Sequence, residues 1–513
     1  MNQSALFTDF YELTMAQLYF KTGLHQQRAQ FDFLYRSNPD YGGHQAGYCI
    51  LAGIEPLCKW ISSTRFTSSD IEHLKSHRSS SGRPLFDQTF LNWLNDKPLI
   101  DSLDLHSIKE GRVIHPNEPV IIVKGDLVQC QILESALLNT INYQTLVATK
   151  ASRIREVGGE RTLIEFGMRR AHSQAADAGT RAALIGGAHF SSNTAVSYDL
   201  GVPPKGTLAH SMIQVFLALG EGELAAFEAY AHLYPDDCLL LVDTINTLES
   251  GVPNAIRVFE KLRAAGHKPA GIRLDSGDLA HLAVRSTAML DEAGFTDTKI
   301  VLSNNIDELV LMQIFQQIRE EAPRWGVKEE SVLNKITFGV GTRLITSEGH
   351  SALDGVYKLT ALEKDGSWKP ALKISDSPEK VITPGEKQVW RLYDKRGIAT
   401  ADLVCEGHED PQKGDASLLL RHPSNPEIAR RIQRSDLSEM EPLHFAQIEK
   451  GSISADFPDI AALRKRRDYD LAKLDTGVRR IINPHIYQVF LSDRLWEKKA
   501  KLIKALNEGS HLR

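Results

Sequence analysis

Between residues 239 and 340 the chain repeats one pattern of hydrophobic and polar positions. A short apolar run is followed by a polar or glycine-rich turn and then by a segment with helical periodicity. This order is typical of consecutive βα units, in which the strands run parallel. The predicted strands are residues 239–242, 271–274, 300–302 and 336–340.

Helical periodicity marks the segments between these strands. Pro253 opens one segment and Gly266 follows it, which is the usual placement of proline and glycine at helix ends. Two further helices are predicted from apolar residues spaced three and four apart, around 279–290 and 306–314. With earlier strands at 163–166 and 205–207, the strand count approaches that of a closed or nearly closed barrel. We therefore expect an α/β fold with an irregular (β/α) barrel.

The pattern changes on both sides of this region. Residues 113–128 alternate as in strands, and residues 357–374 suggest a hairpin about the turn at 364–367, with another hairpin near 394–397. We expect residues 146–345 to form the barrel, and residues 1–145 and 346–405 to form a second, β-rich α+β domain. Residues 406–513 are predicted to be mainly helical, and the basic run at 464–467 is interpreted as a solvated helix face.

Composition narrows the class of protein. The 513 residues are 42% hydrophobic and carry a net charge of −5, so the chain can bury a large core but has no basic field for nucleic acid or anionic membranes. Five cysteines without paired spacing favour a reducing compartment, and no apolar run reaches the roughly 18 residues of a membrane span. A cytoplasmic protein that binds its ligands locally is expected.

Polar and small residues follow each predicted parallel strand, where a ligand site is expected at the carboxyl ends. Carboxylates there can bind ribose hydroxyls or Mg²⁺, and glycine lets the backbone approach a phosphate. A turn carboxylate that only caps the next helix is the alternative for any single turn. Four such turns in succession favour one phosphosugar site; they contain Asp243, Thr244, Asp275, Ser276, Gly277, Asp278, Ser303, Asn304, Asn305, Gly341 and Thr342.

Two upstream segments carry further candidates. Arg169 and Arg170 follow a predicted strand and suit pyrophosphate, although exposed arginines that open a surface helix are an equal alternative. Phe166 can stack on a planar ring or fill the core. His210 follows a glycine turn and can be a base, a metal ligand or a nucleophile, although a structural role is commoner for a lone histidine.

Taken together, these segments resemble the nicotinate phosphoribosyltransferase family. The resemblance is carried by TDFYELTM at 8–15, EFGMRRA at 165–171, GTLAHS at 206–211, LVDT at 241–244, GIRLDSGD at 271–278, FGVGTRL at 338–344 and LDGVYKL at 353–359. Several motifs in order over most of the chain are more specific than any one of them.

The resemblance implies a dimer in which Asp9 and Tyr11 reach the partner's active site. It implies that Tyr11 and Phe166 sandwich the pyridine ring, and that Arg273 and Thr207 recognise its carboxylate. Asp243 and Asp275 would be catalytic and hold ribose or Mg²⁺, and His210 would be phosphorylated by ATP. The phosphoribosyl donor would be bound by Asp9, Arg169, Ser276, Gly277, Asp278, Ser303, Asn304, Gly341 and Thr342.

The implied reaction joins nicotinate to 5-phosphoribosyl 1-diphosphate, giving nicotinate mononucleotide and pyrophosphate in NAD biosynthesis. ATP hydrolysis is coupled to it, so the family is classed among ligases. Related nicotinamide and quinolinate phosphoribosyltransferases are the nearest rivals. Residues 191–193 contain no acidic partner for an amide, and a quinolinate enzyme would need a more basic pocket and a shorter chain. A non-catalytic sugar-phosphate sensor is the alternative from another class.

Overall fold

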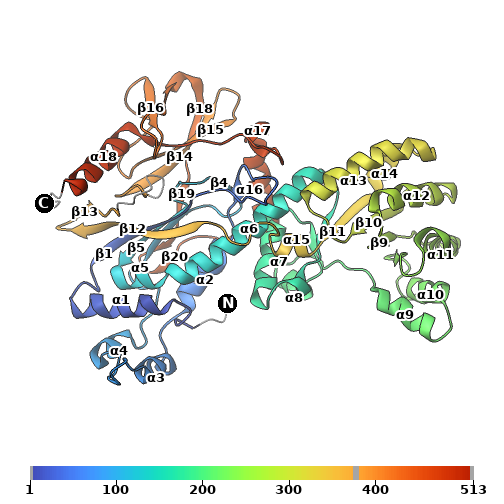
Figure 1. Ribbon diagram of the computed structural model, residues 1–513, viewed down its shortest axis with the longest axis horizontal. Helices are drawn as coiled ribbons and strands as arrows, with labels where there is room; N and C mark the ends of the chain where they lie inside the picture. The colour runs from blue at the N-terminus through green and yellow to red at the C-terminus, as the bar shows by residue number, and fades with distance from the viewer. Residues whose placement is uncertain (1–3, 374–380, 509–513) are drawn as a thin grey trace. The chain divides into compact units, whose positions relative to one another are not determined.

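The computed structural model describes residues 4–373 and 381–508, which divide into two compact units. Unit 1 contains residues 1–149 and 352–513, and unit 2 contains residues 150–351. The long helix α6 (Glu134–Gly158) runs from one unit into the other. Figure 1 shows the elements of both units, coloured along the chain.

Unit 2 contains a six-stranded parallel sheet in the order β7-β6-β11-β10-β9-β8. Its strands are β6 (Leu163–Glu165), β7 (Phe190–Ser191), β8 (Leu239–Leu241), β9 (Gly271–Leu274), β10 (Lys299–Ser303) and β11 (Ile336–Val340). Its helices are α7 (Gln174–Gly186), α8 (Thr194–Asp199), α9 (His210–Ala218), α10 (Glu223–Leu233), α11 (Val252–Ala264), α12 (Leu279–Glu292), α13 (Glu308–Glu321), α14 (Glu329–Lys335) and α15 (Thr342–Ile345). Short helical turns are Met168–Arg170, Thr247–Gly251 and Ala322–Trp325.

The four strands predicted between residues 239 and 340 are confirmed, as are the helices between them. The predicted strand at 205–207 is wrong. The backbone N–H of Lys205 donates to the Ser191 carbonyl at 2.9 Å, but no ladder forms, because the preceding Pro203 and Pro204 have no N–H to contribute. Among the described residues the parallel sheet ends at β7 and β8, which do not pair with each other, so it is open and not a closed barrel.

Unit 1 contains two larger sheets and one two-stranded pair. The seven-stranded sheet has the order β13-β12-β1-β5-β3-β19-β20, the six-stranded sheet has the order β17-β16-β21-β15-β14-β18, and β2 pairs with β4. The strands are β1 (Arg28–Tyr35), β2 (Cys49–Ile50), β3 (Asp104–Ile108), β4 (Val113–Ile114), β5 (Ile121–Asp126), β12 (Gly355–Lys364), β13 (Ser367–Pro370), β14 (Lys387–Asp394), β15 (Ala399–Glu406), β16 (Ser417–Arg421), β17 (Ala429–Gln433), β18 (Leu437–Pro442), β19 (His444–Glu449), β20 (Ser452–Ile453) and β21 (Val489–Ser492).

The helices of unit 1 are α1 (Phe10–Lys21), α2 (Ile54–Ser63), α3 (Ser68–Ser76), α4 (Gln88–Leu94), α5 (Leu127–Ile132), α16 (Ile460–Ala472), α17 (Thr476–Arg479) and α18 (Asp493–Asn507), with a short turn at Arg434–Asp436. The first sheet joins segments far apart in sequence, since β1 pairs with β12 on one side and β5 on the other (Figure 1). The hairpins about residues 364–367 and 394–397 are confirmed; Ile374, the end predicted for the first, lies outside the described residues.

The prediction that residues 406–513 are mainly helical is wrong. Strands β16–β21 lie in this region, and β21 pairs with both β15 and β16. Strand β17 buries only Ile432 and exposes its other four residues, so it lacks the alternation that predicts a strand. Within the basic run, Arg467 is buried and not solvated as expected. None of the helices in the described ranges combines the length and hydrophobicity needed to cross a membrane.

Candidate active site

The carboxyl ends of β8, β9, β10 and β11 lie next to one another, because these strands are neighbours in the parallel sheet. The polar turns that follow them therefore meet along one edge, as the sequence predicts. We call these turns, with residues 165–172 and 206–211, the strand-end site. It lies in unit 2.

Asp243, directly beyond β8, joins three parts of the strand-end site. Its Oδ1 lies 3.1 Å from Nε2 of His210, and its Oδ2 accepts the Asp275 backbone N–H at 3.0 Å. The Ser276 hydroxyl donates to the same Oδ2 at 2.6 Å. The Asp243 side chain is only 1% exposed, so both of its oxygens are committed to protein donors. Asp243 thus fixes the position of the His210 ring and of the turn after β9.

Arg273 is the second residue that links separate parts of the strand-end site. The neighbours of Arg273 in β9 are buried, so this side chain faces the opposite side of the sheet. Its Nε donates to the Ser303 hydroxyl at 2.9 Å, one terminal nitrogen to the Thr207 hydroxyl at 3.0 Å, and the other to Oδ1 of Asp275 at 2.8 Å. Since a guanidinium has five N–H groups, one on each terminal nitrogen is left without a partner among the described residues. Two adjacent N–H groups match the two oxygens of a carboxylate.

The aromatic ring of Phe166 lies beside this guanidinium. The Arg273 carbon Cζ is 5.4 Å from the ring centroid, within the range of a cation–π contact. Gly339 of β11 makes room for the ring, because a Cβ there would come within 2.3 Å of two Phe166 ring carbons. The backbone N–H of Phe166 donates to the Val340 carbonyl at 2.8 Å, which holds the residue beside β11.

Glu165 supports this segment, and no role was predicted for it. It is fully buried, and its carboxylate accepts from the Thr180 hydroxyl at 3.0 Å, from the Ser191 hydroxyl at 2.6 Å and from the Gly167 backbone N–H. Burial raises the pKa of Glu165, although these donors act in the opposite direction. A carboxylate at the end of a buried strand was the only signal in the sequence. Glu165 positions the turn that carries Phe166 and Arg169.

The loops after β10 and β11 adjoin because Ser303 pairs with Gly339. Asn304 and Asn305 both have positive φ angles, 90° and 51°, a conformation that asparagine tolerates better than most residues. They are exposed, as is Thr342 across from them. Arg169 is also exposed, on the short turn Met168–Arg170. These residues leave backbone and side-chain donors open to a ligand.

Asp278 fits the alternative of helix capping. One oxygen accepts the His281 backbone N–H at 3.1 Å and caps α12, and the other accepts from the Gln317 side chain at 2.7 Å. Burial acts to raise the pKa of Asp278, but these hydrogen bonds outweigh it and the pKa is lowered.

By contrast, the hydroxyl oxygen of Thr244 is buried without a hydrogen-bond partner among the described residues. A buried orphan hydroxyl beside Asp243 suits a polar ligand atom.

Two predicted site residues lie in unit 1 and not in unit 2. Asp9 precedes α1, and its carboxylate accepts from the Ser135 hydroxyl at 2.6 Å. Tyr11, on the first turn of α1, is 48% exposed. Among the described residues no group of three or more histidines, cysteines, aspartates or glutamates is arranged to hold a metal ion.

A parallel α/β sheet with arginine, carboxylates and a histidine gathered at its carboxyl end defines an enzyme that binds its ligand across strand-end loops. Comparison with known proteins identifies which one. Family models for nicotinate phosphoribosyltransferase match most of the chain: the N-terminal domain at residues 6–142, the family at 162–396 and the C-terminal domain at 386–499.

Full-length relatives agree. A nicotinate phosphoribosyltransferase of Bacillus subtilis (strain 168) is 36% identical over 97% of this chain and 95% of its own, and one of Homo sapiens is 31% identical over 96% and 95%. The crystal structure of human nicotinic acid phosphoribosyltransferase superposes with a TM-score of 0.78, at 28% identity over 97% of this chain and 99% of that one. The chain belongs to the nicotinate phosphoribosyltransferase family. It is an enzyme of NAD biosynthesis with that activity.

Proposed function

We propose that the strand-end site of unit 2 binds nicotinate and 5-phosphoribosyl 1-diphosphate side by side and joins them with coupled ATP hydrolysis. The observation that carries this proposal is the pair of open N–H groups on Arg273 next to the Phe166 ring. A planar ring with a carboxylate substituent fits that pair, since the ring stacks on Phe166 while the carboxylate takes the guanidinium fork. Thr207 holds the guanidinium in place.

The donor is proposed to occupy the remaining turns. Asn304 with Gly341 and Thr342 would bind the 5-phosphate from two adjoining loops, and Arg169 would contact the pyrophosphate. Ser276 and Gly277 would lie along the ribose, where the Gly277 φ of 75° favours glycine. Asp278 is better explained as the cap of α12 than as a donor ligand.

Mg²⁺ fits one of the two proposed carboxylates. Asp275 offers Oδ2, which has no protein partner among the described residues, whereas both oxygens of Asp243 are taken. One carboxylate together with substrate phosphates is a usual environment for this ion. When bound, Mg²⁺ would neutralise charge on the leaving pyrophosphate. Asp243 does not itself bind the ion in this arrangement, but it holds Asp275 and Ser276 in place.

In the reaction the pyridine nitrogen attacks the anomeric carbon, the bond from that carbon to the pyrophosphate oxygen breaks, and pyrophosphate leaves. Positive charge develops on the ribose in the transition state, next to the carboxylates of Asp243 and Asp275. Fixed carboxylates there stabilise this charge without having to reorganise. The turns of the strand-end site that hold the pyridine ring and the donor align the two reacting atoms.

His210 is the proposed acceptor of the ATP phosphoryl group. Its Nε2 contacts Asp243, and its Nδ1 has no hydrogen-bond partner among the described residues; the side chain is 37% exposed. An Nε2–H bonded to the carboxylate leaves the Nδ1 lone pair available as a nucleophile. A bond from Nδ1 to the γ-phosphorus forms, the bond from that phosphorus to the bridging oxygen breaks, and ADP leaves. Water then hydrolyses the phosphohistidine.

A homodimer with shared sites is also proposed. Tyr11 and Phe10 on α1 expose their rings, and α9 exposes Val215 and Leu217 while burying only Ile213. An exposed apolar helix face next to catalytic residues is typical of a subunit interface. Tyr11 from one chain would cover the pyridine ring in the site of the other chain.

The activity is tested by supplying the purified chain with donor and one of nicotinate, nicotinamide or quinolinate, with and without ATP. Nicotinate mononucleotide should form fastest, and ATP should increase its yield. Faster product formation from nicotinamide or quinolinate would contradict the proposed Arg273 contact.

The phosphohistidine is tested with ATP labelled in the γ-phosphoryl group. Wild-type chain should carry acid-labile label, and a His210→Ala variant should carry none. A His232→Ala variant, altered at another histidine of unit 2, is the control and should label as wild type does. Equal labelling of the His210→Ala and wild-type chains would remove this part of the proposal.

The shared site is tested by mixing two inactive variants, Tyr11→Ala and Arg273→Ala, after subunit exchange. In a random mixture half of the dimers combine both variants, and each of these has one intact site, so activity should return to about a quarter of wild type. Recovery no greater than the sum of the separate variants would show that Tyr11 acts within its own chain.

A further inference from the structure

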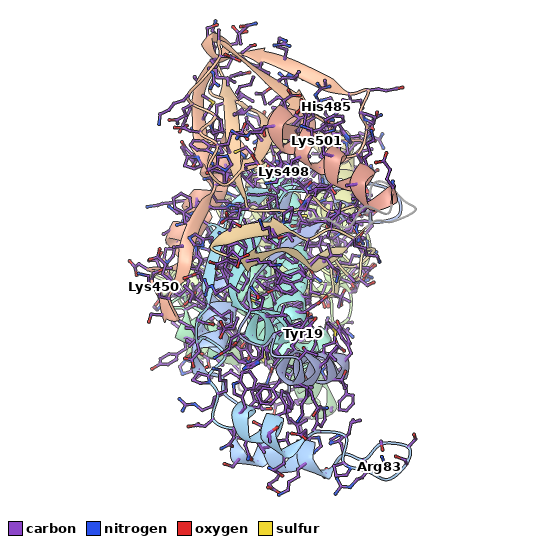
Figure 2. All side chains as sticks on the ribbon, turned by 90° about the vertical axis from the view of Figure 1, so that its left-hand side faces the viewer. Tyr19, Arg83, Lys450, His485, Lys498 and Lys501 are labelled. Atoms are coloured by element: carbon purple, nitrogen blue, oxygen red, sulfur yellow. The ribbon has the colours of Figure 1, made fainter. Side chains whose placement is uncertain are left out.

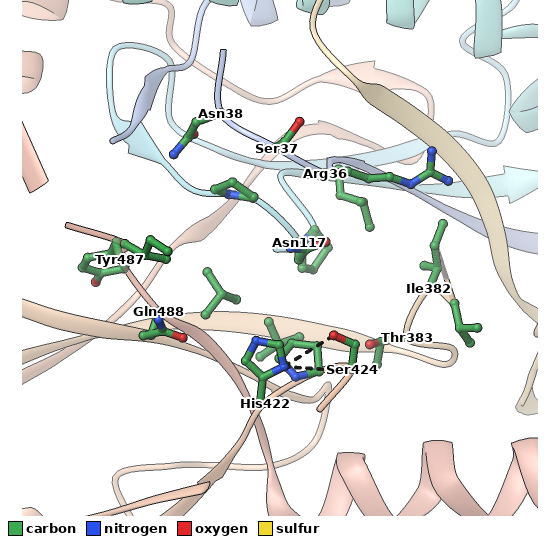
Figure 3. A pocket seen from close by; sticks show the side chains of 18 of the residues that line it. Arg36, Ser37, Asn38, Asn117, Ile382, Thr383, His422, Ser424, Tyr487 and Gln488 are labelled. Atoms are coloured by element: carbon green, nitrogen blue, oxygen red, sulfur yellow. Dashed lines mark hydrogen bonds between the residues drawn. The ribbon is translucent and has the colours of Figure 1, made fainter. Parts of the chain in front are cut away.

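Unit 1 contains a cavity of about 300 Å³ whose residues have no role in the strand-end site. It lies between β1 of the seven-stranded sheet and β14, β15 and β21 of the six-stranded sheet, with α18 contributing one residue. Its volume is at the lower end of the range for small-molecule sites. Figure 3 shows side chains from several separate segments around its open centre, with Asn117 and His422 on opposite sides.

The charges around this cavity are unbalanced. Among the described residues that line it, Asp32 is the only carboxylate, and it is already paired with Nζ of Lys387 at 2.7 Å. Two further cations, Arg36 and Lys499, remain. In the described part of the chain the Arg36 guanidinium has one carboxylate near it, that of the half-exposed Asp354, at 3.6 Å, which is an ion pair beyond hydrogen-bond distance. The described lining therefore carries a net positive charge.

Lys499 is the central observation. The residue is only 5% exposed, and its Nζ donates to the carbonyls of Val381 at 2.8 Å and Pro423 at 3.1 Å. No carboxylate pairs with it within the described ranges. A buried ammonium normally has a counter-charge, because its transfer from water is costly. Burial, with Lys387 nearby, lowers the pKa of Lys499 to about 8.

His422 adds a neutral donor. Its Nδ1 accepts the Asn425 backbone N–H at 3.0 Å and lies 3.3 Å from the Ser424 backbone nitrogen. Figure 3 marks the contacts of His422 with Ser424. Burial and then Lys499 lower the pKa of His422, so the ring is neutral near pH 7 and its proton is on Nε2. This N–H has no partner among the described residues. Lys499 also keeps one N–H beyond the two that its carbonyl partners take.

The remaining lining has an apolar part beside polar residues such as Asn38, Asn117 and Gln488. Four prolines contribute to the apolar part, together with aliphatic side chains from both sheets; these are Pro116, Pro119, Pro423, Pro484, Leu34, Val381, Ile382, Val404, Ile486 and Val489. Such a surface suits a ring or hydrocarbon body, while Lys499, His422 and Arg36 suit an oxyanion.

We propose that this cavity binds a small organic anion, with its apolar body among the prolines and its carboxylate or phosphate group on Lys499 and His422. The site goes beyond the proposed function, since none of its residues belongs to the strand-end site. Carboxylate and phosphate share the required chemistry, and the probes below separate them.

Binding is measured by calorimetry on the full chain carrying Arg273→Ala, which removes the oxyanion fork of the strand-end site. The probes are benzoate, phenyl phosphate and benzamide, which share a phenyl ring and differ in the charged group. At least one anion should bind at one per chain, and benzamide should bind about tenfold more weakly or worse. The tighter of the two anions identifies the group that the site takes.

The role of Lys499 is tested by adding Lys499→Met to the same background. Affinity for the anion should fall about tenfold or more, because one charge-assisted hydrogen bond is lost. Lys501→Met is the matched control: Lys501 lies on the same helix, is labelled with Lys498 in Figure 2, and is exposed outside the cavity. It should leave affinity within about twofold.

Arg36→Met provides a second variant if loss of Lys499 prevents folding, and it too should weaken the anions more than benzamide. Equal binding of benzamide and the anions would overturn the proposal. So would unchanged anion affinity in a folded Lys499→Met or Arg36→Met chain, or no anion binding up to about 10 mM.

Discussion

Gly339 is the position at which one added methyl group should test the ring-binding role of Phe166. An alanine Cβ there would lie 2.3 Å from two carbons of the Phe166 ring, and ordinary van der Waals contact begins near 3.4 Å. The Gly339 φ angle is not in the left-handed region, so the backbone itself accepts alanine. The ring must therefore move by about 1 Å, away from its place beside Arg273.

The size of the effect follows from that displacement. Aromatic stacking contributes about 0.5–1.5 kcal/mol, so its loss should raise the KM for nicotinate by about 2- to 12-fold. The donor-binding loops are not displaced directly, so the KM for the phosphoribosyl donor should change less. Overpacking should also lower the free energy of unfolding by about 1–3 kcal/mol.

Steady-state kinetics, with nicotinate and the donor varied in turn, measure the KM for each substrate. Denaturant unfolding measures the free energy of unfolding. Gly43→Ala is the control, because its Cβ would meet nothing within 4 Å. In a Phe166→Ala background the clash is absent, so Gly339→Ala should then leave the KM for nicotinate unchanged. The reasoning is refuted if Gly339→Ala leaves that KM unchanged in the wild-type background, or raises it equally in both backgrounds.

Three further predictions concern charge. Arg273→Lys keeps the charge but loses the two parallel N–H groups, so the KM for nicotinate should rise about tenfold or more and the preference for nicotinate over nicotinamide should fall. A variant whose kinetics on both pyridines equal those of the wild type would contradict this. Asp243→Asn keeps the shape but not the charge, and kcat should fall by about 10²–10³-fold in single-turnover assays; a change of less than about threefold would count against it. Burial raises the pKa of Glu12 to about 7, so the folded chain holds this proton more tightly than the unfolded chain. The contribution of protonated Glu12 to the free energy of unfolding is therefore fully present below about pH 4.5 and is lost as the pH rises through 7. After allowance for solvent screening this contribution is about 2 kcal/mol. Glu12→Gln should flatten the pH dependence of Tm between pH 5 and 8, whereas the exposed control Glu72→Gln should not.

The strands and turns of unit 2 could be predicted because they are local. An apolar run such as 271–274, followed by Asp275 and a glycine, specifies a strand and a turn through residues adjacent in sequence. The sequence did not show where the sheet ends. A strand was predicted at residues 205–207, but Pro203 and Pro204 have no N–H, so no ladder of backbone hydrogen bonds forms there. Strands β16–β18 were missed because they are short and none of them alternates between buried and exposed positions.

The same division between sequence and tertiary structure holds for the roles of the site residues. The sequence by itself determined which residues could act at the strand-end site, because parallel strands bring the residues after them to one edge. Only the tertiary structure decided how they are used: Asp243 is committed to three protein donors, Asp278 caps α12, and Arg273 keeps two N–H groups open. The cavity around Lys499 likewise has no signature in the chain. Its lining comes from segments between residues 32 and 499, and packing of two sheets, which depends on contacts distant in sequence, is what places them around one space.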